Sequence, residues 1–241
     1  MNRALYAAAS GMAAQQQNLE LIAQNLSNAD VSGFKGIQAS FAGIAADAQT
    51  LGVAPLGTHA VFSQGKLMRG TGEFDLALDG PGFFCVTDAS GNLAYTRNGE
   101  FARAADGTLR SAQGWHLRGV RIPAGAGTVS VAPDGSIFSR TGALQRSLGK
   151  ISVVTFAAPE SLRASGGTLF FATAESGKPR HAALGADRGT SIKFGMLEQS
   201  NVTIVEAMMQ IMAAQRAYEA NAKGVQAADE MLRIANNLNR A

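Results

Sequence analysis

Glycine and proline are distributed unevenly along the 241-residue chain, and this distribution constrains the fold more than any other feature. All six prolines lie between Pro55 and Pro179, and residues 1–30 and 201–241 contain one glycine each of the 28 in the chain. Because both residue types interrupt helices, the two ends can form long helices, and the middle is rich in turns. The sequence therefore predicts an α+β protein with a helix at each end and a β-rich centre.

Both ends repeat apolar residues at alternating spacings of three and four, which is the pattern of a helix packed along one stripe. This pattern fits terminal helices paired as a coiled coil, and equally two amphipathic helices packed on a globular body. Thr203 and Glu206 have the spacing of a capping box, and Asn201 is the other candidate N-cap. The two stripes are Leu5, Ala8, Met12, Gln15, Leu19, Ile22 and Leu26, and Ile204, Met208, Ile211, Gln215, Tyr218, Ala222, Val225, Asp229 and Leu232. They are imperfect, because Gln15, Gln215 and Asp229 are polar residues at core-type positions.

Residues 58–195 alternate apolar and polar side chains around short turns, which is typical of antiparallel strands. Asp-Gly pairs at 79–80, 106–107 and 134–135 predict three hairpins. No helical crossover pattern separates the strands, so we expect a mainly antiparallel meander or small barrel. We expect residues 36–57 to be a tether with little regular structure, or a short helix. This tether would join a helical arm, residues 1–35 with 196–241, to a β-rich body, residues 58–195.

Residues that usually carry chemistry are few and scattered. The histidines, His59, His116 and His181, lack metal-ligand spacing, and the glycine-rich segments lack the context of a phosphate or dinucleotide site. Cys85 is the single cysteine, and its apolar surroundings in sequence predict burial rather than reactivity. We therefore expect no catalytic residue, no cofactor and no metal. A ligand- or carbohydrate-binding β domain with helical oligomerisation arms, and a secreted hydrolase, stay open as other classes.

Charge and hydropathy narrow the possible partners. The net charge of +3 is too small to argue for nucleic acid or an anionic membrane. No apolar run is long enough to predict a membrane-spanning helix, and the N-terminus does not fit a cleavable signal peptide. Only 16% of residues are charged, which indicates that much of the surface meets other protein. The apolar stripes of the two arms also imply a partner, because such stripes are unfavourable in water.

The segment "NLSNADVSGFK", residues 25–35, ends the first predicted helix and contains no candidate chemistry. We expect Asn25 and Asn28 to close the helix and Ser32-Gly33 to turn the chain. Phe34 is expected to anchor the turn against a neighbouring helix, while Lys35 stays in water.

Three segments resemble the bacterial flagellar rod and hook proteins, in the order that this family has them. They are "NLSNADVSGFK", then "EFDLALDGPGFFCV" followed by "AYTRNGEF", and finally "LEQSNVTIVEAMMQIMAAQRAYEANAKGVQAADEML". The resemblance covers nearly the whole chain. Among flagellar basal-body rod proteins, it is greatest to the distal rod type, with the proximal rod type as the alternative.

The resemblance implies a structural subunit of a hollow helical tube that spans the periplasm and transmits torque to the hook. It implies terminal helices in an inner coiled-coil layer, and export by the flagellar type III apparatus without a cleavable signal. The implied partners are further copies of the chain, other rod proteins, the hook protein and the P and L rings of the basal body. The expected assembly interface is Leu5, Met12, Leu19, Ile22, Asn25, Leu26, Asn28, Gly33, Phe34, Asn201, Ile204, Met208, Ile211, Gln215, Tyr218, Val225 and Leu232.

Overall fold

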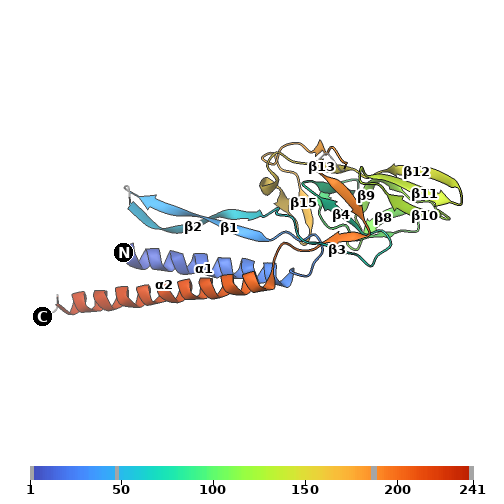
Figure 1. Ribbon diagram of the computed structural model, residues 1–241. Coiled ribbons are helices and arrows are strands. Elements are labelled where there is room, and N and C mark those ends of the chain that lie inside the picture. Colours follow the sequence, from blue (N-terminus) through green and yellow to red (C-terminus); the bar gives the residue numbers. More distant parts are fainter. Residues whose placement is uncertain (1–2, 47–48, 186–188, 239–241) are drawn as a thin grey trace. The chain divides into compact units, whose positions relative to one another are not determined.

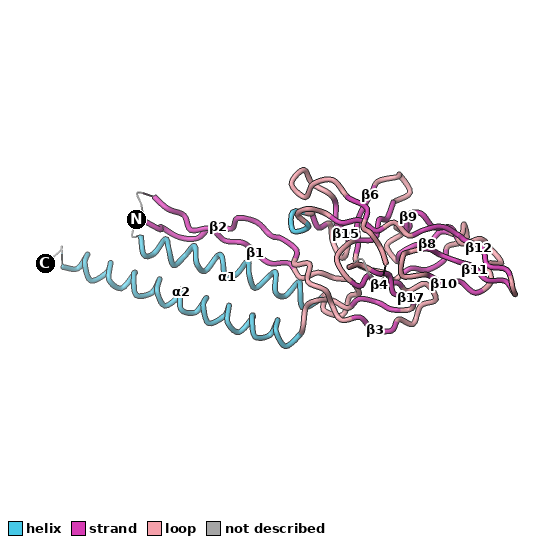
Figure 2. Tube along the Cα trace, turned by 45° about the horizontal axis from the view of Figure 1, so that its top comes forward, coloured by secondary structure: helices cyan, strands magenta, loops and turns pink. Residues whose placement is uncertain are grey.

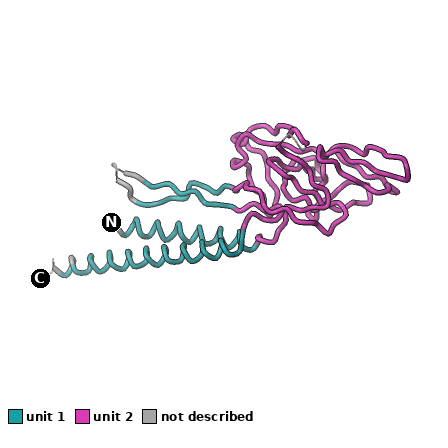
Figure 3. The backbone as a smooth tube through the Cα atoms, in the orientation of Figure 1, with its two compact units in different colours: residues 1–27, 37–59, 203–241 teal, residues 28–36, 60–202 magenta. Residues whose placement is uncertain are grey.

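The computed structural model describes residues 3–46, 49–185 and 189–238, and the chain forms two compact units (Figure 3). Unit 1 draws on residues 1–27, 37–59 and 203–241, and unit 2 on residues 28–36 and 60–202. Unit 1 holds two long helices, and unit 2 is an antiparallel β structure. The predicted α+β class is therefore confirmed.

In unit 1, the helices α1 (Arg3–Ser27) and α2 (Ile204–Leu238) lie side by side and run in opposite directions (Figure 1). Alanine, glutamine, leucine and methionine dominate both helices, and all four favour helix. The N-cap of α2 is Thr203, whose Oγ1 accepts the Glu206 N–H at 3.3 Å. α1 ends at Ser27, immediately before Asn28, where the sequence predicted its end.

The expectation of an irregular or helical tether at residues 36–57 is wrong. These residues enter the strands β1 (Ile37–Ala46) and β2 (Gln49–Ala60), which form a two-stranded sheet beside α1 (Figure 2). The Val53 N–H donates to Ser10 Oγ at 3.1 Å, so part of the hairpin is held by the helix. The sequence around residues 36–57 does not show that these residues pack beside α1, so the prediction missed the hairpin. Residues 47–48 of the tether, and residues 1–2 and 239–241 of the arm, lie outside the described residues.

The described residues of unit 2 form short strands and a 3-10 turn, η1 (Pro159–Ser161). The strands are β3 (Leu67–Arg69), β4 (Leu76–Asp79), β5 (Phe83–Thr87), β6 (Leu93–Thr96), β7 (Phe101–Arg103), β8 (Thr108–Ser111), β9 (His116–Arg121), β10 (Thr128–Val131), β11 (Ser136–Thr141), β12 (Leu144–Lys150), β13 (Val153–Thr155), β14 (Arg163–Ala164), β15 (Leu169–Phe171), β16 (Arg180–His181), β17 (Ser191–Phe194) and β18 (Met196–Glu198). The largest sheet follows the order β10-β11-β12-β9-β5-β6-β15-β14, with β7, β8, β13 and β16 beside this path.

Two of the three predicted Asp-Gly hairpins are confirmed. The turns at Asp106 and Asp134 join the antiparallel pairs β7–β8 and β10–β11. The hairpin predicted at Asp79 is wrong, because β4 pairs with β17 near the end of unit 2. Similarly, β3 pairs with β18. The turn signal was local, whereas the partner strand is distant in sequence.

Strand β5 lies between two apolar cores. Phe84 and Val86 belong to one cluster, and Phe83 and Cys85 belong to the other. A strand buried on both faces reads as an unbroken apolar run, which explains the segment "FFCV". Cys85 is buried and free, as its sequence context predicted. Burial also raises the pKa of its thiol above the ordinary value, which disfavours the reactive thiolate.

Candidate assembly site

One side chain ties the end of α1 to the start of β1. Asn25 donates its Nδ2–H to the carbonyl oxygen of Ile37 at 2.7 Å, and its Oδ1 accepts the Ile37 N–H at 2.8 Å. The buried amide therefore satisfies both backbone polar groups of one residue. Asn25 thus bonds within its own chain. The carbonyl of Asn28 accepts the Val31 N–H at 3.1 Å in the turn that follows.

Gly33 makes the turn that leads from this helix into unit 2. Its φ angle is 69°, which side chains rarely adopt, and its N–H donates to the carbonyl oxygen of Glu198 at 2.7 Å. A Cβ at this position would lie 2.3 Å from the backbone nitrogen of Asn98, which cannot move aside easily. The predicted Ser-Gly turn is confirmed, and glycine is required for both reasons.

Directly after this turn, a triad of charged side chains is buried in unit 2. Lys35 Nζ lies 2.6 Å from Glu198 Oε1, and Arg97 Nη1 lies 3.2 Å from Glu198 Oε2. The side chains of Lys35 and Glu198 are 0% exposed, and that of Arg97 is 4% exposed. Lys35 also donates to the Ser63 carbonyl at 2.7 Å, and the Gly65 N–H donates to Glu198 Oε1 at 2.8 Å.

The expectation that Lys35 stays in water is wrong. Its long stem suggested a solvated head, but Glu198 and a backbone carbonyl supply the partners that burial demands. Burial lowers the pKa of Lys35 below its ordinary value, while the adjacent Glu198 carboxylate opposes this shift. The pKa of Arg97 is lowered for the same reason and is opposed by the same carboxylate. Phe34 is buried, and its expected contact with a neighbouring helix stays a prediction.

Asn201 connects three segments of unit 2. Its Oδ1 accepts the Gly36 N–H at 2.8 Å, and its Nδ2 donates to the Val61 carbonyl at 2.7 Å and to Ser63 Oγ at 2.9 Å. The backbone adds a bond from Val61 N–H to the Gly36 carbonyl at 2.8 Å. Asn201 therefore acts as a cross-link rather than as the predicted alternative N-cap.

We call this set the junction, defined by Gly33, Lys35, Arg97, Glu198 and Asn201. The chain passes between the two units after residues 27, 36, 59 and 202. The connections after residues 36, 59 and 202 each lie within two residues of Gly36, Val61 or Asn201. Asn201 is hydrogen-bonded to both Gly36 and Val61. Part-buried hydrogen bonds of Asn201 therefore hold these chain ends together in unit 2.

The predicted stripe of α1 is partly buried, and Ala14, which the prediction did not include, is buried as well. Ile22 is buried, and Leu5, Met12, Leu19 and Leu26 are half-buried.

The packing stripe of α2 differs from the prediction. Its buried residues are Ala207, Ala214 and Ala228, whereas the predicted Ile204, Met208, Gln215, Tyr218 and Leu232 are exposed, and Ile211 and Val225 are half-buried. The sequence prediction favoured the larger apolar residues. Small residues are buried instead because the helices approach closely: a Cβ on Gly11 would lie 2.8 Å from the Asn221 amide.

The large apolar residues of α2 form an exposed stripe near its N-terminus, namely Ile204, Val205, Met208, Met209 and Met212. Met208 is 54% exposed and Val205 is 69% exposed. Spacings of three, four and seven residues place Val205, Met208, Met209 and Met212 on one side of the helix. No described residue of the chain covers this stripe.

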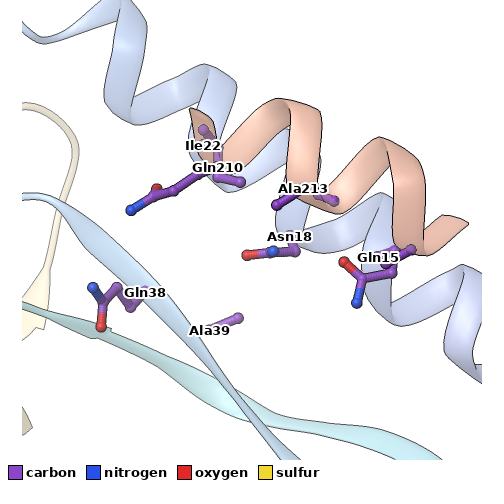
Figure 4. A pocket seen from close by; sticks show the side chains of 9 residues that line it. Gln15, Asn18, Ile22, Gln38, Ala39, Gln210 and Ala213 are labelled. Carbon is purple, nitrogen blue, oxygen red and sulfur yellow. The ribbon is translucent and has the colours of Figure 1, made fainter. Parts of the chain in front are cut away.

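An open groove of about 450 Å³ lies between α1, α2 and β1 within unit 1 (Figure 4). The side-chain amides of Gln15, Asn18, Gln38 and Gln210 line it, together with Ile22 and four alanines. These amides can donate and accept hydrogen bonds but cannot transfer protons near neutral pH. The groove therefore suits binding of polar groups rather than catalysis.

The histidines do not form a metal centre in the described part of the chain, where no group of three or more His, Cys, Asp or Glu side chains is placed to hold an ion. His59 lies 3.2 Å from Ser40 Oγ. His116 lies 2.9 Å from Thr108 Oγ1 and 3.2 Å from Arg110. Among the described helices, none is long and apolar enough to cross a membrane.

Comparison with known proteins identifies the family. Residues 5–35 match the model of the flagella basal body rod protein, residues 77–147 the flagellar hook protein FlgE/F/G D1 domain, and residues 194–238 the flagellar basal body rod FlgEFG protein C-terminal model. The flagellar basal-body rod protein FlgG of Borreliella burgdorferi is 38% identical over 266 aligned residues, which cover all of both chains. The chain belongs to the flagellar basal-body rod protein family.

Other rod-family relatives are similar over the same length. FlgG of Bacillus subtilis is 33% identical over the whole of both chains. FlgF of Salmonella typhimurium is 32% identical over 99% of this chain and 98% of its own. The rod family is structural, so the expectation that this chain is not an enzyme is confirmed by family membership.

Sequence reasoning missed several residues that build the site. No sequence pattern singled out Arg97 and Glu198, because their burial depends on strands that are distant in sequence. The buried alanines of α2 had a detectable signal, since Ala207, Ala214, Asn221 and Ala228 recur at intervals of seven residues. Small size at that interval indicates a close helix pair.

Proposed function

We propose that this chain is a rod subunit of the distal type that assembles with further copies into a hollow helical tube. Such a tube would span the periplasm and transmit torque to the hook. The relatives named FlgG support this assignment, since they match the chain from end to end. The observation that carries the assembly proposal is the exposed apolar stripe of α2, which a neighbouring copy would cover.

Unit 1 would act as the assembly arm, with α1 and α2 paired as a coiled coil. The seven-residue recurrence of Ala207, Ala214, Asn221 and Ala228 supports this pairing, because a coiled coil repeats its contacts at that interval. The predicted interface residues that remain exposed, such as Ile204 and Met208, would then face other copies. The contact joins different surfaces of two subunits, so it can continue as an open helix.

The junction would carry mechanical load between the arm and the β unit. Buried charge pairs and amide cross-links have defined geometry and resist replacement by water. Torque transmission needs such fixed geometry in every subunit and needs no chemical step. Asn25, Gly33 and Asn201 would thus serve assembly indirectly, by holding the chain ends that lead into the arm.

The wider partners and the location of the chain follow from the same proposal. Other rod proteins, the hook protein and the P and L rings would contact the assembled tube, and the flagellar export apparatus would deliver the subunit without a cleavable signal. The subunit would reside in the periplasmic part of the basal body. Deleting the gene from its own organism should leave basal bodies with the proximal rod but without the distal rod. Loss of the proximal rod instead would assign the chain to the FlgF-like type.

Electron microscopy of the concentrated protein tests the assembly proposal. The wild-type chain is expected to form tubes or helical fibres, and Met208→Asp/Met212→Asp is expected to abolish them, because two buried carboxylates would lack partners in the interface. Both side chains are exposed within the chain, so the subunit itself should stay folded. Met68→Asp places the same charge on an exposed methionine of β3 and should leave assembly intact. Tubes formed equally by both variants would refute the role of the stripe.

A further inference from the structure

Methionines are concentrated on the exposed stripe of α2. Met208, Met209 and Met212, which we call the methionine cluster, lie within five consecutive residues, although the whole chain contains eight methionines. Their exposed fractions are 54%, 55% and 51%. An apolar contact alone does not require methionine at these positions, because leucine has a similar volume and also favours helix. The feature that distinguishes the cluster from a leucine stripe is its thioether sulfur.

The methionine cluster faces away from the buried side of its helix. An α-helix turns by about 100° per residue, so Met209 and Met212 lie on the side opposite Ala207 and Ala214. Those two alanines are buried. A chemical change at the cluster therefore leaves the buried side of α2 untouched, and the sulfur atoms are open to small solutes in the free subunit.

We propose that the methionine cluster is an oxidation site through which peroxides control assembly of the subunit. The inference rests on the proposed function, in which another copy covers this stripe. The thioether sulfur attacks one oxygen of hydrogen peroxide, and an S–O bond forms as the O–O bond breaks. The departing hydroxide takes the proton from the oxygen left on sulfur. The sulfur thus loses two electrons and becomes a sulfoxide, and the peroxide is reduced to water.

A sulfoxide is suited to water but not to a covered apolar surface. Its oxygen is a polar acceptor, and a contact made by apolar side chains offers it few donors. Burying an unpaired acceptor costs free energy, so each sulfoxide is expected to raise the concentration needed for assembly roughly tenfold. Conversely, a neighbouring copy that covers the cluster keeps peroxide away from it. Oxidation and assembly therefore oppose each other, and the unassembled subunit is the sensitive form.

The other methionines show why position matters as well as reactivity. Met12 and Met196 are half-buried and should react more slowly than the cluster. Met68 is 43% exposed on β3 and Met231 is 59% exposed on α2, so both should react about as readily. Neither belongs to the cluster, so their oxidation is expected to leave assembly intact.

Peroxide treatment of the dilute full-length chain, followed by assembly, tests the proposal. Mass spectrometry of peptides would locate the sulfoxides, and sedimentation with electron microscopy would measure assembly. The wild type is expected to gain sulfoxides in the cluster and to need roughly tenfold more protein, or more, to assemble. Methionine sulfoxide reductases supplied with a dithiol are expected to reverse the effect, because they return the sulfoxide to the thioether.

Met208→Leu/Met209→Leu/Met212→Leu is the matched control. Leucine keeps the approximate volume and the helix preference but has no sulfur to oxidise. This variant should assemble like the untreated wild type both before and after peroxide, although Met68 and Met231 remain available for oxidation. Circular dichroism at 222 nm should be the same for treated and untreated protein, which separates a change of the surface from unfolding.

Three results would overturn the proposal. The first is an absence of sulfoxides from the cluster of the dilute wild type, and the second is assembly of the oxidised wild type at its original concentration. The third is loss of assembly in the treated leucine variant, which would assign the effect to methionines elsewhere. Failure of the untreated wild type to assemble would instead refute the proposed function and, with it, the control of assembly. Sulfoxide mapping would then still decide whether the cluster is an oxidation site.

Discussion

Glu198 faces two buried cations, Lys35 and Arg97, and this imbalance makes it the residue on which the junction depends. Replacing it by glutamine keeps the shape but removes the negative charge. Because uncompensated charges would remain buried, Glu198→Gln should destabilise unit 2 by about 3–5 kcal/mol. Urea denaturation followed by Trp115 fluorescence would measure this loss. Glu100→Gln changes an exposed carboxylate of the same unit and should alter stability by less than about 0.5 kcal/mol. Equal effects of the two variants would contradict a buried role for Glu198.

Two hairpin turns are expected to make unit 2 sensitive to acid. The Thr108 hydroxyl and N–H donate to Asp106, and the Ser136 N–H and hydroxyl donate to Asp134, and these bonds lower the pKa of both carboxyls below the ordinary 3.8. The unfolded chain therefore takes up protons first as the pH falls. The stabilisation is complete well above pH 3.8 and disappears as the pH falls through the lower folded-state pKa.

Denaturation midpoints between pH 5 and pH 3 would test this sensitivity. The wild type should lose stability across this range, and Asp106→Asn/Asp134→Asn should lose less, because asparagine keeps an acceptor oxygen but does not titrate. Identical pH profiles for the two proteins would show that other carboxyls govern the acid response.

At the scale of elements, the sequence predicted what depends on local pattern. It located α1 and α2, the Thr203 cap, and the hairpins at Asp106 and Asp134, because composition, capping and turn chemistry act over a few residues. It did not predict the β1–β2 hairpin, part of which is held by α1. It also did not predict the pairing of β4 with β17, because these two strands are distant in sequence. The same limit applies to the junction, whose charges meet only after folding.

The close approach of α1 and α2 leads to a prediction about residue size. Ala214 is buried in the pair, so Ala214→Leu should overfill the contact and destabilise unit 1 by about 1–3 kcal/mol. Ala220→Leu makes the same change at an exposed position of α2 and should be nearly neutral. Thermal melting monitored by circular dichroism at 222 nm would compare them. If the two variants melted alike, the alanine stripe would not be the packing surface.

At the scale of the whole molecule, the two units differ in how much apolar area they bury. Unit 2 has two clusters of buried aromatic and aliphatic side chains. The buried apolar side chains described for unit 1 are mainly alanines, with Ile22 the large exception. Hydrophobic stabilisation grows with buried apolar area, so unit 1 should be the less stable unit in a dilute monomer.

Two spectroscopic probes can separate the units. The only tryptophan, Trp115, is half-buried in unit 2 against Phe171, whereas the helical signal at 222 nm comes mainly from α1 and α2 of unit 1. On heating, the helical signal should fall before the Trp115 fluorescence changes. Raising the protein concentration should delay only the helical transition, because assembly stabilises the arm by mass action. Coincident transitions at every concentration would mean that the arm and the β unit unfold together, and that assembly does not supply the missing burial of unit 1.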